Sequence, residues 1–294
     1  MQQNEWLWVD TSSKAEKALE DVENSPVIGI DTEYDSFRYF RDKLCLIQVK
    51  AKRKTYLFDP LGNIDLSFLG KSFAASSACK IMHAGDNDIR ILKRDYGFFF
   101  SNTFDTHRAA SLLGCSHLSL AALVERYLGI GFEKNKKIQR SKWDIRPLTE
   151  EQLEYAAMDT AYLPDLYHTL EAEIIKAGLE TKAVEAFAEM TKLVWREKEL
   201  DQRGHKKIGG YRELPDNRKE RLKRLFRWRY LKAKAINRAF FLVLSDKDLF
   251  FLSGMEIGNL EDLADKGLLS QDKIRFLGHE LVEILSGKDV SIKA

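Results

Sequence analysis

The stretch Val27-Ile-Gly-Ile-Asp31-Thr-Glu33 decides the fold, because a compact apolar run ends here in two carboxylates. The run up to Asp31 is typical of a buried strand. Side chains two positions apart on a strand point to the same face, so Asp31 and Glu33 are expected to lie side by side. Two adjacent carboxylates repel each other unless a cation lies between them, and Mg²⁺ prefers oxygen ligands of this kind. The alternative is a pair of solvent-facing acids at a strand end.

Further strands are expected on both sides of this stretch. Residues 6–10 alternate between apolar and polar side chains, and apolar runs at 44–49 and 55–59 follow closely enough to form an antiparallel meander. Residues 80–83 predict another short strand, which leads into a helix over 86–96. The pattern then becomes mostly helical. Strands first and helices later predict an α/β core with a helical tail.

The helix over 86–96 carries two acids in its first turn. The positive end of a helix dipole favours an acid there. Asp86 is expected to cap this helix, which leaves Asp88 projecting from the first turn. Simple capping by both acids is the alternative.

A later helix carries a tyrosine and an acid on one face. Thr149 and Gln152 fit a capping box, which predicts a helix start near Glu150. Tyr155 and Asp159 are four residues apart in this helix and therefore share a face. An amphipathic helix with one surface acid is the alternative.

Taken in chain order, these motifs resemble the DEDDy group of 3′-5′ exonucleases, and in particular the ribonuclease D family. The resemblance extends to the segments around each motif: Val-Ile-Gly-Ile-Asp31-Thr-Glu33, Leu46-Ile-Gln48, Phe58-Asp-Pro60, Phe104-Asp105-Thr106 and residues 146–159. The tail, with Leu225-Phe-Arg-Trp228-Arg and Ala235-Ile-Asn-Arg-Ala-Phe240, resembles an HRDC domain, the helical module of RecQ helicases and ribonuclease D. Full-length bacterial ribonuclease D resembles an exonuclease with two such modules, whereas this chain has room for one.

The resemblance implies an α/β, RNase H-like 3′-5′ exonuclease fold over residues 1–175. A helix and linker over 176–211 and an all-helical HRDC-like domain over 212–294 would follow. It also implies two divalent cations, Mg²⁺ or Mn²⁺, bound by Asp31, Glu33, Asp88 and Asp159. Asp31, Glu33 and Asp159 would hold one ion, and Asp31 and Asp88 the other, with Asp88 acting through water. Tyr155 would orient the attacking water.

The charge of the chain is strongly asymmetric. The total is only +2, but residues 203–238 contain fourteen Lys and Arg against three Asp and Glu, a net charge of +11 that leaves −9 for the rest. Such asymmetry indicates nucleic-acid contact, with a solvated helix face as the alternative. A second basic run at 134–142 is expected to be a surface loop. The expected nucleic-acid contacts are Lys136, Lys137, Arg140, Arg221, Arg224 and Arg227.

Three aromatic side chains follow closely after Glu33. Phe37, Tyr39 and Phe40 are candidates to stack on a terminal base, with core packing as the alternative.

The resemblance and the charge together predict an exoribonuclease that releases nucleoside 5′-monophosphates from RNA 3′ ends, acting as a monomer. Precursors of tRNA, or other structured RNA with a 3′ extension, are the expected substrates. A DNA exonuclease and a non-catalytic nucleic-acid-binding protein remain open. No apolar run approaches the ~18 residues of a membrane span, and the N-terminus lacks a signal-peptide pattern. Three separated cysteines favour the reducing cytoplasm.

Overall fold

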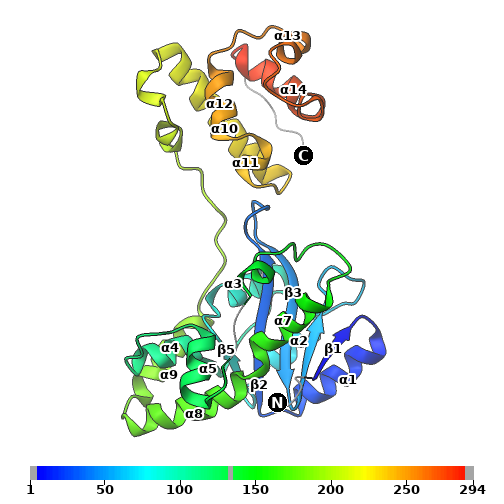
Figure 1. The fold of residues 1–294 in the computed structure, drawn as a ribbon, viewed down its shortest axis with the longest axis vertical. Coiled ribbons are helices and arrows are strands. Elements are labelled where there is room, and N and C mark those ends of the chain that lie inside the picture. The colour runs from blue at the N-terminus through cyan, green and yellow to red at the C-terminus, as the bar shows by residue number, and fades with distance from the viewer. Residues whose placement is uncertain (1–4, 132–134, 289–294) are drawn as a thin grey trace. The chain divides into compact units, whose positions relative to one another are not determined.

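The computed structural model describes residues 5–131 and 135–288, which form two compact units (Figure 1). The first unit comprises the chain up to Asp35 together with Lys43–Arg196. The second comprises Ser36–Asp42 together with the chain from Glu197 onward. Among the described residues, none of the helices combines the length and the hydropathy needed to cross a bilayer.

The first unit is built on a six-stranded mixed sheet. Its strands are β1 (Glu5–Val9), β2 (Val27–Asp35), β3 (Lys43–Ala51), β4 (Lys54–Phe58), β5 (Cys79–Met82) and β6 (Thr103–Asp105). They lie in the order β1-β4-β3-β2-β5-β6. The pairs β2–β3 and β3–β4 are antiparallel, which confirms the predicted meander, whereas β1, β5 and β6 pair in parallel with their neighbours. The pattern did not predict β6.

Helices cover both faces of this sheet (Figure 1). They are α1 (Ser12–Glu23), α2 (Leu69–Ala74), α3 (Asp86–Tyr96), α4 (Thr106–Leu112), α5 (Leu120–Leu128), α6 (Lys136–Gln139), α7 (Glu150–Ala161), α8 (Leu163–Lys176) and α9 (Glu180–Thr191). Apolar side chains of α1, α2 and α3 form one core with β2 and β3. On the other face, α7 packs across β2, β3 and β4.

Gly29 allows the helices of this second face to approach β2 closely. A Cβ atom at this position would lie 3.2 Å from both the Leu163 Cβ and the Thr160 carbonyl oxygen. The absence of a side chain thus brings the α7–α8 junction down onto β2, two residues before Asp31.

The second unit contains mainly helices. They are η1 (Gly204–Lys207), η2 (Tyr211–Glu213), α10 (Asp216–Ala235), α11 (Phe240–Val243), α12 (Asp246–Ser253), α13 (Leu260–Asp265) and α14 (Gln271–Leu285). Leu222, Leu225 and Trp228 of α10 recur every three residues along one side of the helix and lie in the core of the unit. Leu231 continues the same spacing but is 38% exposed. Phe40, from the β2–β3 connection, belongs to this core.

Candidate active site

Asp31 and Glu33 lie on the face of the sheet that α7 covers. Asp31 pairs with Gln48 across the antiparallel β2–β3 ladder, and Glu33 pairs with Leu46. Leu46 packs against Tyr155 and Ala156 of α7 in one cluster, which identifies this face. Glu33 is buried and Asp31 half-buried. The two carboxylates thus share a face, as the i, i+2 spacing predicted.

Tyr155 and Asp159 come to the same place from α7. The helix begins as predicted: the Thr149 hydroxyl accepts a hydrogen bond from the Gln152 amide, and the Gln152 side chain accepts one from the Thr149 amide. Tyr155 and Asp159 are both buried. One turn apart on this helix, their side chains are joined by a hydrogen bond.

The pKa of the Tyr155 phenol reflects the negative charges of the carboxylates around it. Its pKa is raised far above the ordinary value of 10, first by burial and then by the negative charges of Asp159, Glu33 and Asp31. Three acids from two elements therefore act on one hydroxyl group. A phenol held in this way stays protonated at neutral pH and can donate a hydrogen bond.

Asp88 approaches β2 from α3, in the first helical turn as predicted. Its carboxylate accepts a hydrogen bond from the Thr32 hydroxyl. Thr32 lies between Asp31 and Glu33 on the strand, so its side chain points to the opposite face. Burial raises the pKa of Asp88 to about 6, with the nearby charge of Asp105 adding to the shift. The structure thus turns Asp88 toward Thr32 rather than toward the acidic pair.

The prediction that Asp86 caps α3 is wrong. The N-cap residue is Gly85, and no side chain caps the helix through it. Asp86 instead forms an ion pair with Arg108 at 2.8 Å. The fully buried Asp105, at the end of β6, accepts the Gly85 amide at 2.9 Å. The hydrogen bond at the start of α3 is thus made by the Asp105 carboxylate of β6, whereas the local sequence predicted that Asp86 would cap the helix.

The four acids offer only oxygen donors, and three of them, Glu33, Asp88 and Asp159, are largely shielded from water. Carboxylate oxygens in this environment are the ligands that hard divalent cations prefer. In the described part of the chain, no three Asp, Glu, His or Cys side chains are close enough together to hold a metal ion directly. The oxygen donors of these four acids therefore fit a divalent cation. In the described residues, however, no three of them are close enough together to bind one directly.

Gln48 is a residue of this site that the sequence reasoning did not single out. It lies directly opposite Asp31, and its side chain is completely buried. Within the described residues, neither its amide nitrogen nor its amide oxygen has a hydrogen-bond partner. The available signal was a polar amide inside the otherwise apolar run 44–49. A buried amide without partners is costly, which marks this position beside Asp31 as unusual.

The basic run at 134–142 is anchored next to Tyr155. Residues from 135 onward are described, whereas Lys134 lies outside the described residues. The expected loop contains the short helix α6. The Trp143 indole donates to the Gln139 carbonyl at 3.2 Å, and its ring lies 6.0 Å from the Tyr155 ring. Among the described residues of this anchored segment, the exposed cations are Lys136, Lys137, Arg140 and Lys142.

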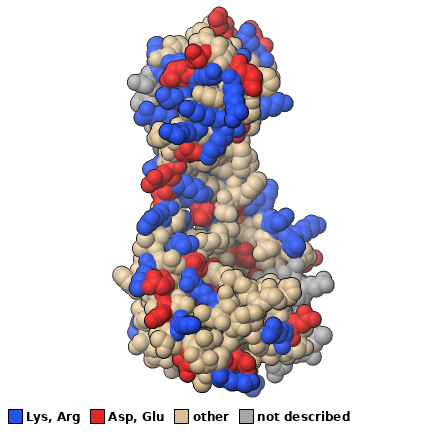
Figure 2. Space-filling model, turned by 90° about the vertical axis from the view of Figure 1, so that its left-hand side faces the viewer, with Lys and Arg blue, Asp and Glu red and all other residues tan. Residues whose placement is uncertain are grey.

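The basic residues of α10 divide into two groups. Figure 2 shows Lys and Arg side chains gathered on the helical unit. The guanidinium of Arg221 donates to the Ser253 and Met255 carbonyls, at 3.3 and 2.7 Å. Arg221 therefore serves the packing of α10 on α12, a role that the charge count did not foresee. Arg227 is exposed and Arg224 half-buried, so Arg227 offers the more accessible cation.

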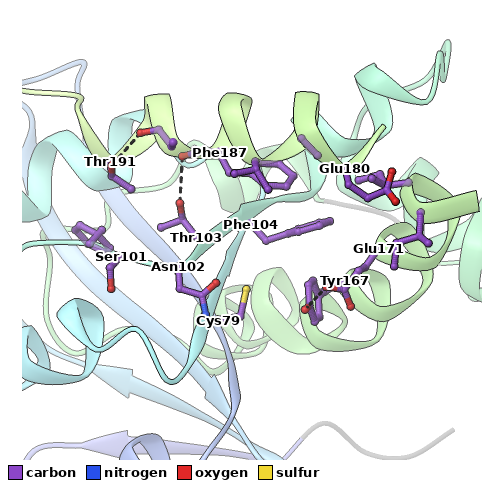
Figure 3. A pocket seen from close by; sticks show the side chains of 16 residues that line it. Cys79, Ser101, Asn102, Thr103, Phe104, Tyr167, Glu171, Glu180, Phe187 and Thr191 are labelled. Atoms are coloured by element: carbon purple, nitrogen blue, oxygen red, sulfur yellow. Dashed lines mark hydrogen bonds between the residues drawn. The ribbon is translucent and has the colours of Figure 1, made fainter. Parts of the chain in front are cut away.

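A large cavity lies away from these acids. It has a volume of about 570 Å³ and is lined mainly by apolar side chains of β6, α8 and α9, among them Phe104, Ile174 and Phe187 (Figure 3). None of the predicted carboxylates lines it. The acidic site therefore lies on the sheet surface under α7 rather than in this cavity.

Curated relatives match the first unit of the chain. The exosome complex component 10 homolog of Drosophila melanogaster is 36% identical over 181 residues, 61% of this chain and 20% of that protein. The exosome complex exonuclease RRP6 of Saccharomyces cerevisiae is 35% identical over 173 residues, 58% of this chain and 23% of that protein. The chain thus matches about a fifth to a quarter of the length of these relatives.

Solved structures resemble the chain over nearly its whole length. The catalytic core of RRP6 from Trypanosoma brucei has a TM-score of 0.84 at 22% identity, covering 96% of this chain and 79% of that one. RNase D of Escherichia coli, described as an exoribonuclease involved in structured RNA processing, has a TM-score of 0.69 at 29% identity. It covers 96% of this chain and 74% of that one.

Family models identify both parts of the chain. A model described as 3′-5′ exonuclease matches residues 6–175, and one described as HRDC domain matches residues 218–285. The expected α/β, RNase H-like exonuclease fold with a helical HRDC domain is therefore confirmed. Since the first match covers more than half of the chain, the chain belongs to the 3′-5′ exonuclease family.

Proposed function

We propose that this protein is a metal-dependent 3′-5′ exoribonuclease of the ribonuclease D type. Precursors of tRNA, or other structured RNA with a 3′ extension, are its substrates. The observation that carries this proposal is that Asp31 and Glu33 lie on the face of the sheet covered by α7, the helix that carries Tyr155 and Asp159. The similarity to an RNase D described as acting on structured RNA supports the choice of substrate. Three buried free thiols support a cytoplasmic location, where we propose that the protein acts as a monomer.

Two divalent cations, Mg²⁺ or Mn²⁺, are the proposed cofactors. Asp31, Glu33 and Asp159 would hold one, and Asp31 with Asp88 the other. When bound, such ions stabilise negative charge on the phosphate and favour ionisation of water. Asp88 would act through a bound water, since its carboxylate can accept further hydrogen bonds beside the one from Thr32.

The reaction is a hydrolysis in which atoms and charges balance. The water oxygen bonds to phosphorus, and the bond between phosphorus and the 3′ oxygen of the preceding nucleotide breaks. The products are a nucleoside 5′-monophosphate and an RNA shortened by one nucleotide with a free 3′ hydroxyl. In this scheme the protonated Tyr155 donates its hydrogen bond to Asp159, and its phenol oxygen accepts a hydrogen bond from the attacking water and so orients it.

Replacing Tyr155 by Phe tests this orienting role. We expect kcat to fall by about ten- to a hundredfold, the effect of losing one hydrogen bond to a charged or reacting group. Because the phenol pKa is raised, the wild-type enzyme should show no loss of activity from phenol ionisation up to about pH 10. Single-turnover rates on a 3′-tailed RNA, recorded against pH, measure both effects.

Tyr127→Phe on α5 is the matched control and should retain full activity. An activity of Tyr155→Phe equal to that of the wild type would remove Tyr155 from the mechanism.

RNA binding is assigned to the exposed cations of α6 and α10. The acidic pair repels a polyanion, so affinity for phosphate must come from other surfaces. Lys136→Ala and Arg227→Ala should each lower the slope of log Kd against log salt for single-stranded RNA by about 0.7. Arg221→Ala should leave this slope unchanged and instead lower the apparent melting temperature, because two carbonyls lose their donor. Fluorescence anisotropy and thermal unfolding separate the two outcomes. An equal slope change in Arg221→Ala would show that this arginine also contacts phosphate.

The activity itself is tested on a 5′-labelled RNA with a structured body and a 3′ tail. With Mg²⁺ or Mn²⁺ the label should appear in a ladder of stepwise shortened products, and EDTA should abolish the ladder. Nucleoside 5′-monophosphates should accumulate in step with shortening. DNA of the same sequence decides between the two nucleic acids. Binding without cleavage under both metals would favour a non-catalytic protein and overturn the proposal.

A further inference from the structure

Two aromatic side chains form an exposed pair on the second unit. The rings of Phe37 and Phe241 have centroids 4.8 Å apart and planes inclined by 46°. The side chains are 71% and 43% exposed, and the adjoining Leu242 is 39% exposed. Aromatic rings normally contribute to the core of a folded domain, so a contacting pair with so much open surface indicates a binding function.

The backbone that carries Phe37 is held firmly within the second unit. Phe40 is 2% exposed, and its ring packs edge-on against Tyr230 and Phe240, with centroids 5.5 and 5.6 Å away. The Arg38 carbonyl accepts the Ala239 amide at 2.9 Å. The sequence predicted Phe37, Tyr39 and Phe40 as candidates for stacking on a base. Phe40 is buried in the core and is therefore no longer a candidate. Phe37 remains the exposed one, on a segment with fixed geometry.

The surroundings of this pair are cationic. Arg38 follows Phe37 directly in the chain, and the exposed Arg238 lies three residues before Phe241. The second unit also carries the basic α10, with Arg227 exposed. Protein-binding patches are depleted of charge at their centre, whereas sites for single-stranded nucleic acid combine aromatic faces with Lys and Arg. Charge complementarity therefore favours a nucleic-acid strand over an apolar protein segment.

The covalent chain places this pair near the catalytic strand. Glu33 and Phe37 are four residues apart, and a fully extended chain spans at most about 3.6 Å per residue. The Cα atoms of the two residues are therefore no more than about 14 Å apart, whatever the arrangement of the units. A strand whose 3′ end reaches Glu33 is therefore long enough, within a few nucleotides, to reach Phe37 as well.

We propose that Phe37 and Phe241 form a stacking platform for a base of the single-stranded 3′ region, upstream of the nucleotide being removed. This inference rests on the proposed exonuclease function. Because every base presents a flat face, the platform accepts any sequence. It would hold the strand between successive hydrolysis steps without reading its bases.

The test uses the full chain and short single-stranded RNAs, with four variants. Phe37→Ala and Phe241→Ala remove the rings, Phe37→Trp keeps an aromatic face, and Phe276→Ala is the control. Phe276 is 58% exposed on α14 of the same unit. A series of RNAs, each with one abasic position at a different distance from the 3′ end, maps where a base contributes to Kd. A dinucleotide with an abasic upstream position, which presents no base to the platform, reports on the chemistry alone.

We expect Phe37→Ala and Phe241→Ala to raise Kd on the order of ten- to a hundredfold for longer RNA. Their kcat/KM on the dinucleotide should equal that of the wild type. In the wild type, one abasic position should weaken binding, and Phe37→Ala should remove this effect. Because no phosphate contact is lost, the salt slope should not change. Phe37→Trp and Phe276→Ala should bind like the wild type.

Two results would overturn the platform while leaving the exonuclease function intact. One is wild-type RNA affinity in both alanine variants, combined with normal hydrolysis of longer RNA and dinucleotide. The other is unchanged RNA binding with altered self-association in sedimentation, which would assign the pair to a second copy of the chain. Failure of the wild type to hydrolyse any RNA would instead contradict the exonuclease proposal, and the abasic series would still test stacking.

Discussion

Asp31→Asn should lower kcat on single-stranded RNA on the order of 10³-fold or more while leaving RNA affinity nearly unchanged. Asp31 is the one acid assigned to both cation sites, and an amide of the same shape lacks the negative charge that binds a hard divalent cation. Its place on β2, opposite Gln48, allows the replacement without a change of volume. Rapid-quench assays give kcat, and anisotropy in EDTA gives the affinity of the metal-free protein.

The matched control for this experiment is Glu154→Gln. Glu154 precedes Tyr155 on α7 but is exposed, so the substitution removes one negative charge from the same helix without touching the site. It should leave kcat within about twofold of the wild type. Full activity in Asp31→Asn would contradict the assignment of this carboxylate, and equal losses in both variants would indicate a general effect of charge.

Asp88→Asn should stabilise the metal-free protein and inactivate the enzyme at the same time. Burial raises the pKa of Asp88 from 3.8 to about 6, so its ionisation at neutral pH costs more free energy in the folded protein than in the unfolded one. At 1.36 kcal/mol per pKa unit, removing this cost should raise the free energy of unfolding by about 3 kcal/mol at pH 7. Loss of a carboxylate assigned to cation binding should lower activity by about a hundredfold.

The pH dependence fixes the sign of this stability effect. The folded state holds the Asp88 proton more tightly than the unfolded state, so stability from this group declines as pH rises from about 4 to about 6. The gain from Asp88→Asn should therefore be largest above pH 6 and should vanish near pH 4. Thermal unfolding in EDTA at both pH values measures it. A lower melting temperature for Asp88→Asn at pH 7 would show that its hydrogen bond with Thr32 outweighs desolvation.

Local signals predicted much of the fold and of the acidic site. The helix at 86–96 has the predicted bounds, and the capping box placed the start of α7 correctly, because capping depends on residues three apart. The Asp31-x-Glu33 spacing specified a shared face because strand periodicity is local. Each of these predictions depends only on residues of the same helix or the same strand.

Features made by distant residues could not be predicted in this way. Strand β6 has three residues and little periodicity of its own, and it forms because β5 offers an edge. The capping role of Asp105 depends on that same strand. Charge counting likewise could not separate Arg221 from Arg227, because only the position of the Ser253 and Met255 carbonyls distinguishes them. The first unit likewise includes α9 and reaches Arg196, because α9 packs on the distant strand β6.

The assignment of Ser36–Asp42 to the second unit limits how the protein can be divided for engineering. A cut near Glu197 would separate two sequence blocks but would leave the tip of the β2–β3 connection without its partners. Phe40 would become exposed, and Arg41 would lose its contacts with Asn237 and Glu197. An isolated nuclease block therefore needs a shortened or polar β2–β3 turn to remain free of aggregation. The HRDC domain therefore provides the packing partners of the β2–β3 connection, and it cannot be exchanged for another domain without leaving Phe40 uncovered.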